Sequence, residues 1–175
     1  MERKECSHGR YILRYTTEER IVGGIYMTIT VKTLERCNKE TEETLAVETP
    51  EFLQQKLAYL KEHQEEFLYA ASDDFANLKM DAVVLEFDET FKVYTALFGL
   101  RLQKKVSAQL KAYLRDNLKG MLGSSSAMFA GDEGIWEINV ALDAMKGFSG
   151  EETIQQAYEL LLGFVTGMLG EIEGQ

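Results

Sequence analysis

Residues that cross-link small proteins are scarce in this 175-residue chain. It has two cysteines, Cys6 and Cys37, besides two histidines and one proline. Two thiols do not make the disulfide framework that is typical of small secreted domains. Folding buries roughly 70 % of the surface of an unfolded chain of this size, which is enough for an apolar core without cross-links. We therefore expect both cysteines to be free thiols and residues 1–175 to form a single globular domain.

Long apolar runs are missing as well. Residues 1–6 are mostly polar and lack the apolar stretch of a secretory signal. The longest nearly apolar run, residues 160–170, has about half of the ~20 residues that a membrane-spanning helix needs. Because the formal net charge is −10, electrostatics oppose binding to nucleic acid and to anionic lipid. The sequence predicts a cytoplasmic protein that binds neither nucleic acid nor membranes.

The pattern of hydrophobicity predicts strands near the start of the chain. Residues 11–15 are rich in β-forming side chains, and residues 25–32 alternate with the period of a half-buried strand. A short loop between the two runs favours an antiparallel hairpin over residues 10–36. The charged stretch at residues 38–44 is typical of a solvated turn.

Three helices are predicted after this hairpin. Residues 49–51, Thr-Pro-Glu, form a helix start, and apolar residues at helical spacing extend this helix to about residue 71. A second helix is expected from about residue 100 to residue 119, where a glycine follows as a stop signal. The third is expected to begin at residues 149–152, which have a capping-box pattern, and to continue to residue 172.

Hairpins are predicted between these helices, so the fold class is α+β. The expected architecture is a mainly antiparallel sheet from hairpins alternating with three helices packed on it. The order of elements over residues 50–173 resembles that of type III secretion chaperone-like domains. The resemblance implies a small, acidic and dimeric domain. Those domains have three strands before the middle helix, whereas this sequence predicts two.

One candidate metal site combines Cys6, His8, Cys37 and His63. If the first two strands paired across a loop near residue 21, Cys6 and Cys37 would meet at the open end of the hairpin. Two thiolates and an imidazole could then hold zinc, with His63 as a fourth ligand. The spacing matches no standard zinc motif, so we expect neither a metal nor another cofactor.

Carboxylates form a second candidate site. Glu86 and Asp88 share one predicted strand face, and Glu137, Asn139 and Asp143 share another. A close pair of carboxyl groups could split its pKa values for acid–base catalysis. Any half-exposed sheet shows the same alternation, and neither strand carries a histidine or lysine. The glycine-containing turns lack the phosphate-binding patterns. We therefore assign no catalytic residue and favour a non-enzymatic protein.

Basic residues gather between residues 101 and 119. This segment has six lysines and arginines and one acidic residue, Asp116, which makes +5 within a chain of −10. The simplest interpretation is a solvent-exposed helix face whose positive charge offsets the negative charge of the domain and which has no binding role. The alternative is a docking face for an acidic protein partner or for the acidic surface of a second subunit. The candidate docking residues are Arg101, Lys104, Lys111, Arg115 and Lys119.

The apolar residues of the last helix extend beyond one face. Leu160 and Phe164 flank the core stripe beside Gly163 and Gly167, which are spaced i, i+4. Each glycine costs a helix about 1 kcal/mol relative to alanine, so a close approach of another backbone is expected there. That approach is either intramolecular or the interface of a homodimer.

These features favour a non-enzymatic protein-binding or regulatory module that forms a homodimer. A chaperone-like role is one form that this function could take. The alternative is a small-ligand or metal-binding protein, or an enzyme, with a cavity between the sheet and the helices.

Overall fold

The sheet is the centre of the structure, a computed structural model that describes residues 4–6, 10–12, 29–120 and 124–174. It contains the strands β3 (Thr33–Asn38), β4 (Thr44–Val47), β5 (Glu66–Ala71), β6 (Met80–Asp88), β7 (Val93–Leu100), β8 (Ser125–Ala130) and β9 (Ile135–Ala141). They pair in the order β4-β3-β5-β6-β7-β9-β8, and every pairing is antiparallel. The strands β1 (Lys4–Cys6) and β2 (Arg10–Ile12) form a separate hairpin.

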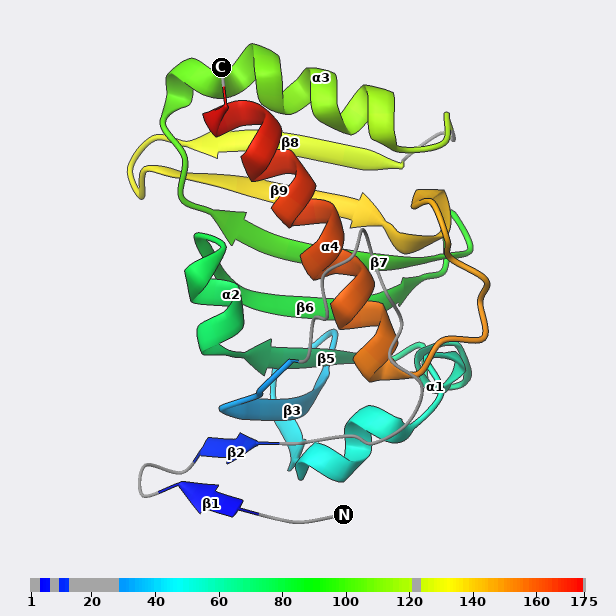
Figure 1. The fold of residues 1–175 in the computed structure, drawn as a ribbon. Helices are drawn as coiled ribbons and strands as arrows, with labels where there is room; N and C mark the ends of the chain where they lie inside the picture. The colour runs from blue at the N-terminus through cyan, green and yellow to red at the C-terminus, as the bar shows by residue number, and fades with distance from the viewer. Residues whose placement is uncertain (1–3, 7–9, 13–28, 121–123, 175) are drawn as a thin grey trace.

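The helices of the described ranges gather on one face of this sheet (Figure 1). They are α1 (Ala58–Glu62), α2 (Asp73–Asn77), α3 (Ser107–Asn117) and α4 (Ile154–Glu173), with the 3-10 turns η1 (Pro50–Gln54), η2 (Lys104–Val106) and η3 (Leu142–Ala144). The long α4 runs diagonally across the strands, and α3 lies at the β8 side. The α+β class is confirmed, although the structure has four α-helices instead of the three expected.

The core lies between the sheet and α4. Cross-strand neighbours place Leu68, Leu85, Ala96 and Val140 in one row on the helix-facing side, and none of them is more than 1 % exposed. The facing stripe of α4 is equally buried, and burial of each large side chain contributes about 1.5–3 kcal/mol. The α2 helix joins this layer because Phe75 packs against Tyr158 of α4, at 5.6 Å between ring centroids.

The helix predicted over residues 50–71 is wrong in its second half. A 3-10 turn and the five-residue α1 occupy residues 50–62, and residues 66–71 form β5 in the interior of the sheet. The sequence of β5 fits a helical period, but pairing with both β3 and β6 satisfies its backbone groups from two sides. From residue 50 onward, the strands before α3 are therefore β5, β6 and β7, one more than the two expected.

The described part of the hairpin predicted over residues 10–36 differs from the prediction. In its described part, β2 pairs with β1, and β3 begins only at Thr33. Residues 29–32 lie outside any strand, so the alternation of Ile29 and Val31 reflects core burial rather than sheet pairing. The Thr30 amide donates to the carboxylate of Asp74 at 2.7 Å and ties this segment to α2. The rest of the predicted second strand, residues 25–28, lies outside the described residues.

Two helix boundaries differ from the sequence prediction. The α3 helix is confined to Ser107–Asn117. The α4 helix begins at Ile154, where Thr153 and Gln156 form the capping box. The predicted box residues do interact, since the Ser149 amide donates to the Glu152 carboxylate at 2.8 Å. They belong to the preceding loop, whose direction change moves the helix start by four residues.

Candidate functional site

The face of the sheet opposite α4 is covered by none of the helices in the described ranges. The strand register places Glu35, Tyr69, Val84, Leu97 and Asn139 in one row across β3, β5, β6, β7 and β9 on this side. The aromatic and aliphatic members of the row are only half-buried. We call this side the open face. Its centre is an apolar stripe, which is unusual for the outer side of a half-solvated sheet.

The charges on the seven strands are almost all of one sign. Their residues include six carboxylates and a single cation, Arg36. Arg36 lies on the helix-facing side, where it binds Glu48 at 2.6 Å and Glu66 at 3.1 Å. The hydrogen bond from Arg36 to Glu48 and the nearby Glu66 raise the pKa of the guanidinium. The remaining five carboxylates belong to the open face, because they alternate with the core residues or contact open-face positions: Glu35, Asp81, Glu86, Asp88 and Glu137.

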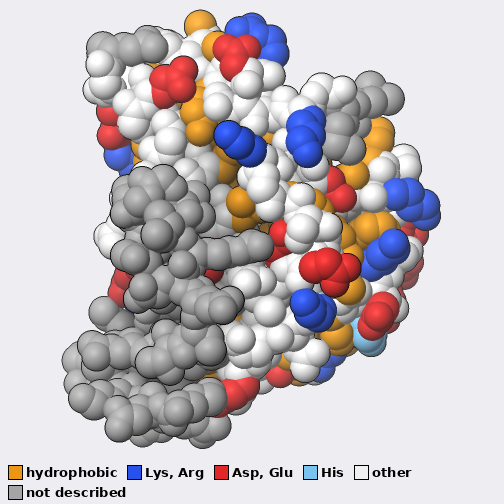
Figure 2. Space-filling view, turned by 45° about the vertical axis from the view of Figure 1, so that its right-hand side comes forward, with side chains coloured by type: hydrophobic (Ala, Val, Ile, Leu, Met, Phe, Trp, Pro, Cys, Tyr) orange, Lys and Arg blue, Asp and Glu red, His pale blue; other side chains and the backbone are white. Residues whose placement is uncertain are grey.

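Cations approach this face only from its borders in the described structure. Lys39, in the turn after β3, donates to the carbonyl oxygen of Phe87 at 2.7 Å and lies near Glu86. Arg101, just after β7, forms an ion pair with Asp81. On a neighbouring side of the molecule, by contrast, basic and acidic side chains are interspersed (Figure 2). The open face is therefore distinguished by its uniform charge.

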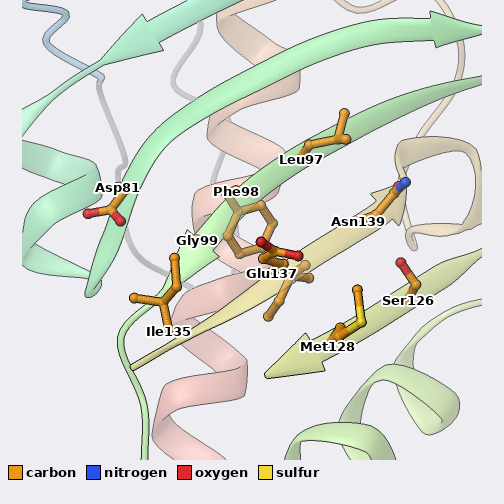
Figure 3. Close-up of a pocket in the computed structure, with 10 residues that line it drawn as sticks. Asp81, Leu97, Phe98, Gly99, Ser126, Met128, Ile135, Glu137 and Asn139 are labelled. Atoms are coloured by element: carbon orange, nitrogen blue, oxygen red, sulfur yellow. The ribbon is translucent and has the colours of Figure 1, made fainter. Parts of the chain in front are cut away.

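A hollow of about 450 Å³ lies at the β7–β9–β8 end of the open face. Figure 3 shows Asp81, Glu137, Met128 and Asn139 on the near side of the strands, with α4 behind them. Met128 is 65 % exposed, which is high for a large apolar side chain. The remaining lining residues are Leu97, Phe98, Gly99, Ser126, Ile135 and Ile138.

Gly99 keeps this hollow open. A Cβ atom at this position would lie 3.1 Å from Oδ2 of Asp81 and 3.1 Å from Cδ1 of Ile135. Glycine therefore lets the Asp81 carboxylate and the Ile135 side chain lie close to the strand on either side. The lining combines carboxylates and an amide with aliphatic groups and has no histidine, cysteine or lysine. A lining that joins apolar groups with a few polar ones is typical of binding surfaces.

The carboxylates predicted as catalytic candidates occupy different environments. Burial raises the pKa of Glu86, and the neighbouring Asp88 raises it further. Asp143 leaves β9 in η3, where it accepts a hydrogen bond from the Tyr94 amide at 2.7 Å, and burial raises its pKa. Glu137 lies on β9 and lines the hollow of the open face, whereas Asp143 does not line it.

The predicted basic stripe is exposed but does not form one helix face. Lys111 and Arg115 lie on α3, Lys104 lies on η2, and Arg101 and Lys119 lie outside the helix. Arg101 reaches back to the hollow through its ion pair with Asp81. Arg115 pairs with the adjacent Asp116 at 2.9 Å, an exposed contact that contributes little to stability. The geometry thus places one end of the stripe beside the open face.

The flank of α4 predicted as a dimer interface is occupied by α3. Phe164 packs edge-on against Tyr113, with 5.2 Å between ring centroids, and Leu160 packs against the core. Gly167 lies beneath the Tyr113 hydroxyl group, while Gly163 is half-buried. The close approach that explains a glycine at position 167 is therefore made by Tyr113 of the same chain.

The predicted zinc ligands do not form a cluster within the described residues, where no group of three histidine, cysteine or carboxylate side chains could hold a metal. Cys6 pairs with Arg10 in its hairpin, whereas Cys37 pairs with Phe67, so the strand pairing on which the site was based is not formed. Cys37 is buried.

The two histidines of the predicted site are placed separately. The ring of His63 stacks on Tyr59 at 4.0 Å between centroids. The position of His8 lies outside the described residues.

Comparisons with protein-family models, with curated proteins and with solved structures give no match to this chain. None of the helices in the described ranges has the length and apolarity that crossing a membrane requires. The candidate site therefore depends on the geometry alone. Sequence reasoning missed Asp81, Leu97 and Met128, although one signal was available, since the strands β4 to β9 contain no lysine or arginine.

Proposed function

We propose that the protein is a non-enzymatic protein-binding module that takes a basic, partly apolar surface of another chain onto its open face. The observation that carries the proposal is the pairing of an apolar stripe with five carboxylates on a sheet face, since the one cation of the strands, Arg36, lies on the opposite face. Apolar contact supplies most of the binding free energy, at about 25 cal/mol for each Å² removed from water. The carboxylates select a positively charged partner and speed its encounter.

The size and position of the surface favour a macromolecular partner over a small ligand. The row from Glu35 to Asn139 crosses five strands, and the hollow occupies only one end of it. A cavity between the sheet and the helices would have favoured the small-ligand alternative. In the described structure that space holds the buried side chains of the core.

The proposal is tested with two synthetic probes, an 18-residue amphipathic peptide of leucine and lysine and its leucine–glutamate counterpart. Titration of the ¹⁵N-labelled protein should move backbone signals of Tyr69, Val84 and Leu97 with the lysine peptide only. Glu137→Lys should weaken this binding at least tenfold. Glu171→Lys, the same charge change at an exposed position on α4, should leave it unchanged. Equal binding of both peptides, or equal effects of both variants, would contradict the proposal.

A further inference from the structure

We infer that the partner on the open face is a second copy of this chain, which places its own α3 surface there. The inference rests on the proposed function and names the occupant of that site. The contact is reciprocal, so that α3 of each copy lies on the open face of the other around a two-fold axis.

The outward side of α3 has the chemistry that the open face requires. Ala108, Lys111 and Arg115 lie on α3 at spacings of three and four residues, Lys104 lies on η2 just before the helix, and all four are exposed. Residues at these spacings share one side of a helix. Ala108 is small and allows the helix to lie close to a sheet, while the long basic side chains reach over its neighbours. The segment 101–119 carries +5, which leaves −15 for the remaining residues of this −10 chain.

Charge complementarity between these surfaces is therefore built into a single chain. The open face offers Glu35, Glu86, Asp88 and Glu137, and no lysine or arginine of the strands lies on it, since Arg36 lies on the helix-facing side. On α3 and η2 the described structure gives Lys104, Lys105 and Lys111 no carboxylate partner, although Lys104 lies 5.9 Å from the ring centroid of Phe129. In the dimer, the carboxylates on the open face of the second copy pair with these lysines.

The positions of the two surfaces allow such a dimer to close. The α3 helix lies at the β8 edge of the sheet, with the other helices, and the hollow lies over β7, β9 and β8 at the same edge but on the opposite face (Figures 1 and 3). Two copies that meet along this side can each bring α3 to the hollow of the other. A reciprocal contact closes on itself and buries two equal patches, which helps it to reach the roughly 1,200–2,000 Å² of a specific interface. It also covers Met128, which is 65 % exposed in one copy.

Sedimentation equilibrium tests self-association at ~100 μM, well above the micromolar affinities of specific complexes. The wild type should be a dimer at low salt and should dissociate at least tenfold more readily in 0.5 M salt, which screens the charges. The variant Lys111→Glu/Arg115→Glu, with reversed charge on α3, should be a monomer. The control Lys92→Glu/Lys146→Glu makes the same charge change at exposed positions outside α3 and should remain a dimer.

A mixing experiment identifies the surface on which α3 docks. The variant Glu137→Lys/Met128→Lys should also be a monomer by itself. When it is mixed with Lys111→Glu/Arg115→Glu, both contacts of the mixed dimer join opposite charges, so a heterodimer should form. Far-ultraviolet circular dichroism checks that each variant is folded. Monomeric wild type, dimers that ignore both reversals, or a folded mixture without heterodimer would overturn the inference.

The two proposals fail in different ways. A wild type that remains monomeric but binds the leucine–lysine peptide on its open face overturns self-association and leaves the proposed function in place. A protein that neither self-associates nor binds the peptide overturns both.

Discussion

The hydroxyl group of Tyr113 lies directly over the backbone of Gly167. It donates a hydrogen bond to the carbonyl oxygen of Phe164 at 3.0 Å, and a Cβ atom at residue 167 would lie only 2.7 Å from its oxygen. Tyr113 of α3 can therefore approach α4 this closely only because residue 167 has no side chain.

Gly167→Ala should lower the free energy of unfolding by about 1 kcal/mol, because overpacking outweighs the gain of about 1 kcal/mol in helix propensity. In a Tyr113→Phe background the nearest ring carbon would lie 3.7 Å from the new Cβ, an ordinary contact, and the same substitution should stabilise. Urea unfolding of the four proteins measures this cycle. Gly170→Ala, with no atom within 4 Å, should stabilise in both backgrounds. Loss of stability in both backgrounds for Gly167→Ala would refute the contact.

Tyr158→Phe should stabilise the protein by about 1–3 kcal/mol. The Tyr158 side chain is fully buried on α4, and its hydroxyl group has no hydrogen-bond partner among the residues that the structure describes. A buried hydroxyl group without a hydrogen-bond partner pays a desolvation cost on folding, and phenylalanine has no hydroxyl group and so no such cost. Burial also raises the pKa of the phenol, so the group stays neutral. Tyr113→Phe is the control, because it removes a paired hydroxyl group and should destabilise by about 1 kcal/mol. Denaturation midpoints that fall for both variants would count against an unpaired Tyr158.

The Cys37 thiol should react slowly in the folded protein. It is 5 % exposed, and burial raises its pKa, which lowers the fraction of reactive thiolate. In a Cys6→Ser variant, we expect a disulfide reagent at pH 8 to label Cys37 at least tenfold more slowly than in urea. Labelling at the rate of a free small thiol, or a thiol already oxidised before denaturation, would contradict this placement.

Glu86 and Glu152 should respond to pH in opposite directions. Burial raises the pKa of Glu86 in the folded state, so its favourable contribution exists at low pH and is lost as the pH rises through that value. Burial opposes ionisation of Glu152, but hydrogen bonds from Ser149 and Gly150 outweigh it and lower the pKa. Its contribution is present at neutral pH and lost as the pH falls.

Unfolding of the two glutamine variants from pH 3.5 to pH 7.5 tests this pair. Relative to wild type, Glu86→Gln should gain stability as the pH rises, while Glu152→Gln should lose it. Parallel pH profiles for the two variants would show that the environments of these carboxylates are wrongly assigned.

Several elements follow from local sequence, and others do not. Residues 80–88 and 135–141 form strands as their alternation predicts, since one face of each is apolar. The α4 helix also follows from its apolar stripe. Residues 66–71 could not be assigned in this way, because their pattern fits a helix and only the neighbouring strands β3 and β6 make them a strand. The short β4 carries no period at all and depends on pairing with β3.

The candidate site divides in the same way. The amino-acid sequence by itself determined that the strands would carry carboxylates and almost no cations, and that residues 101–119 would be basic. Only the tertiary structure decided that five of those carboxylates share the face that none of the described helices covers. The reason is that the direction of a side chain depends on the strand register, and a shift of one residue would move each side chain to the other face. It also decided that Tyr113 fills the space above Gly167, a contact between residues 54 positions apart that no local pattern encodes.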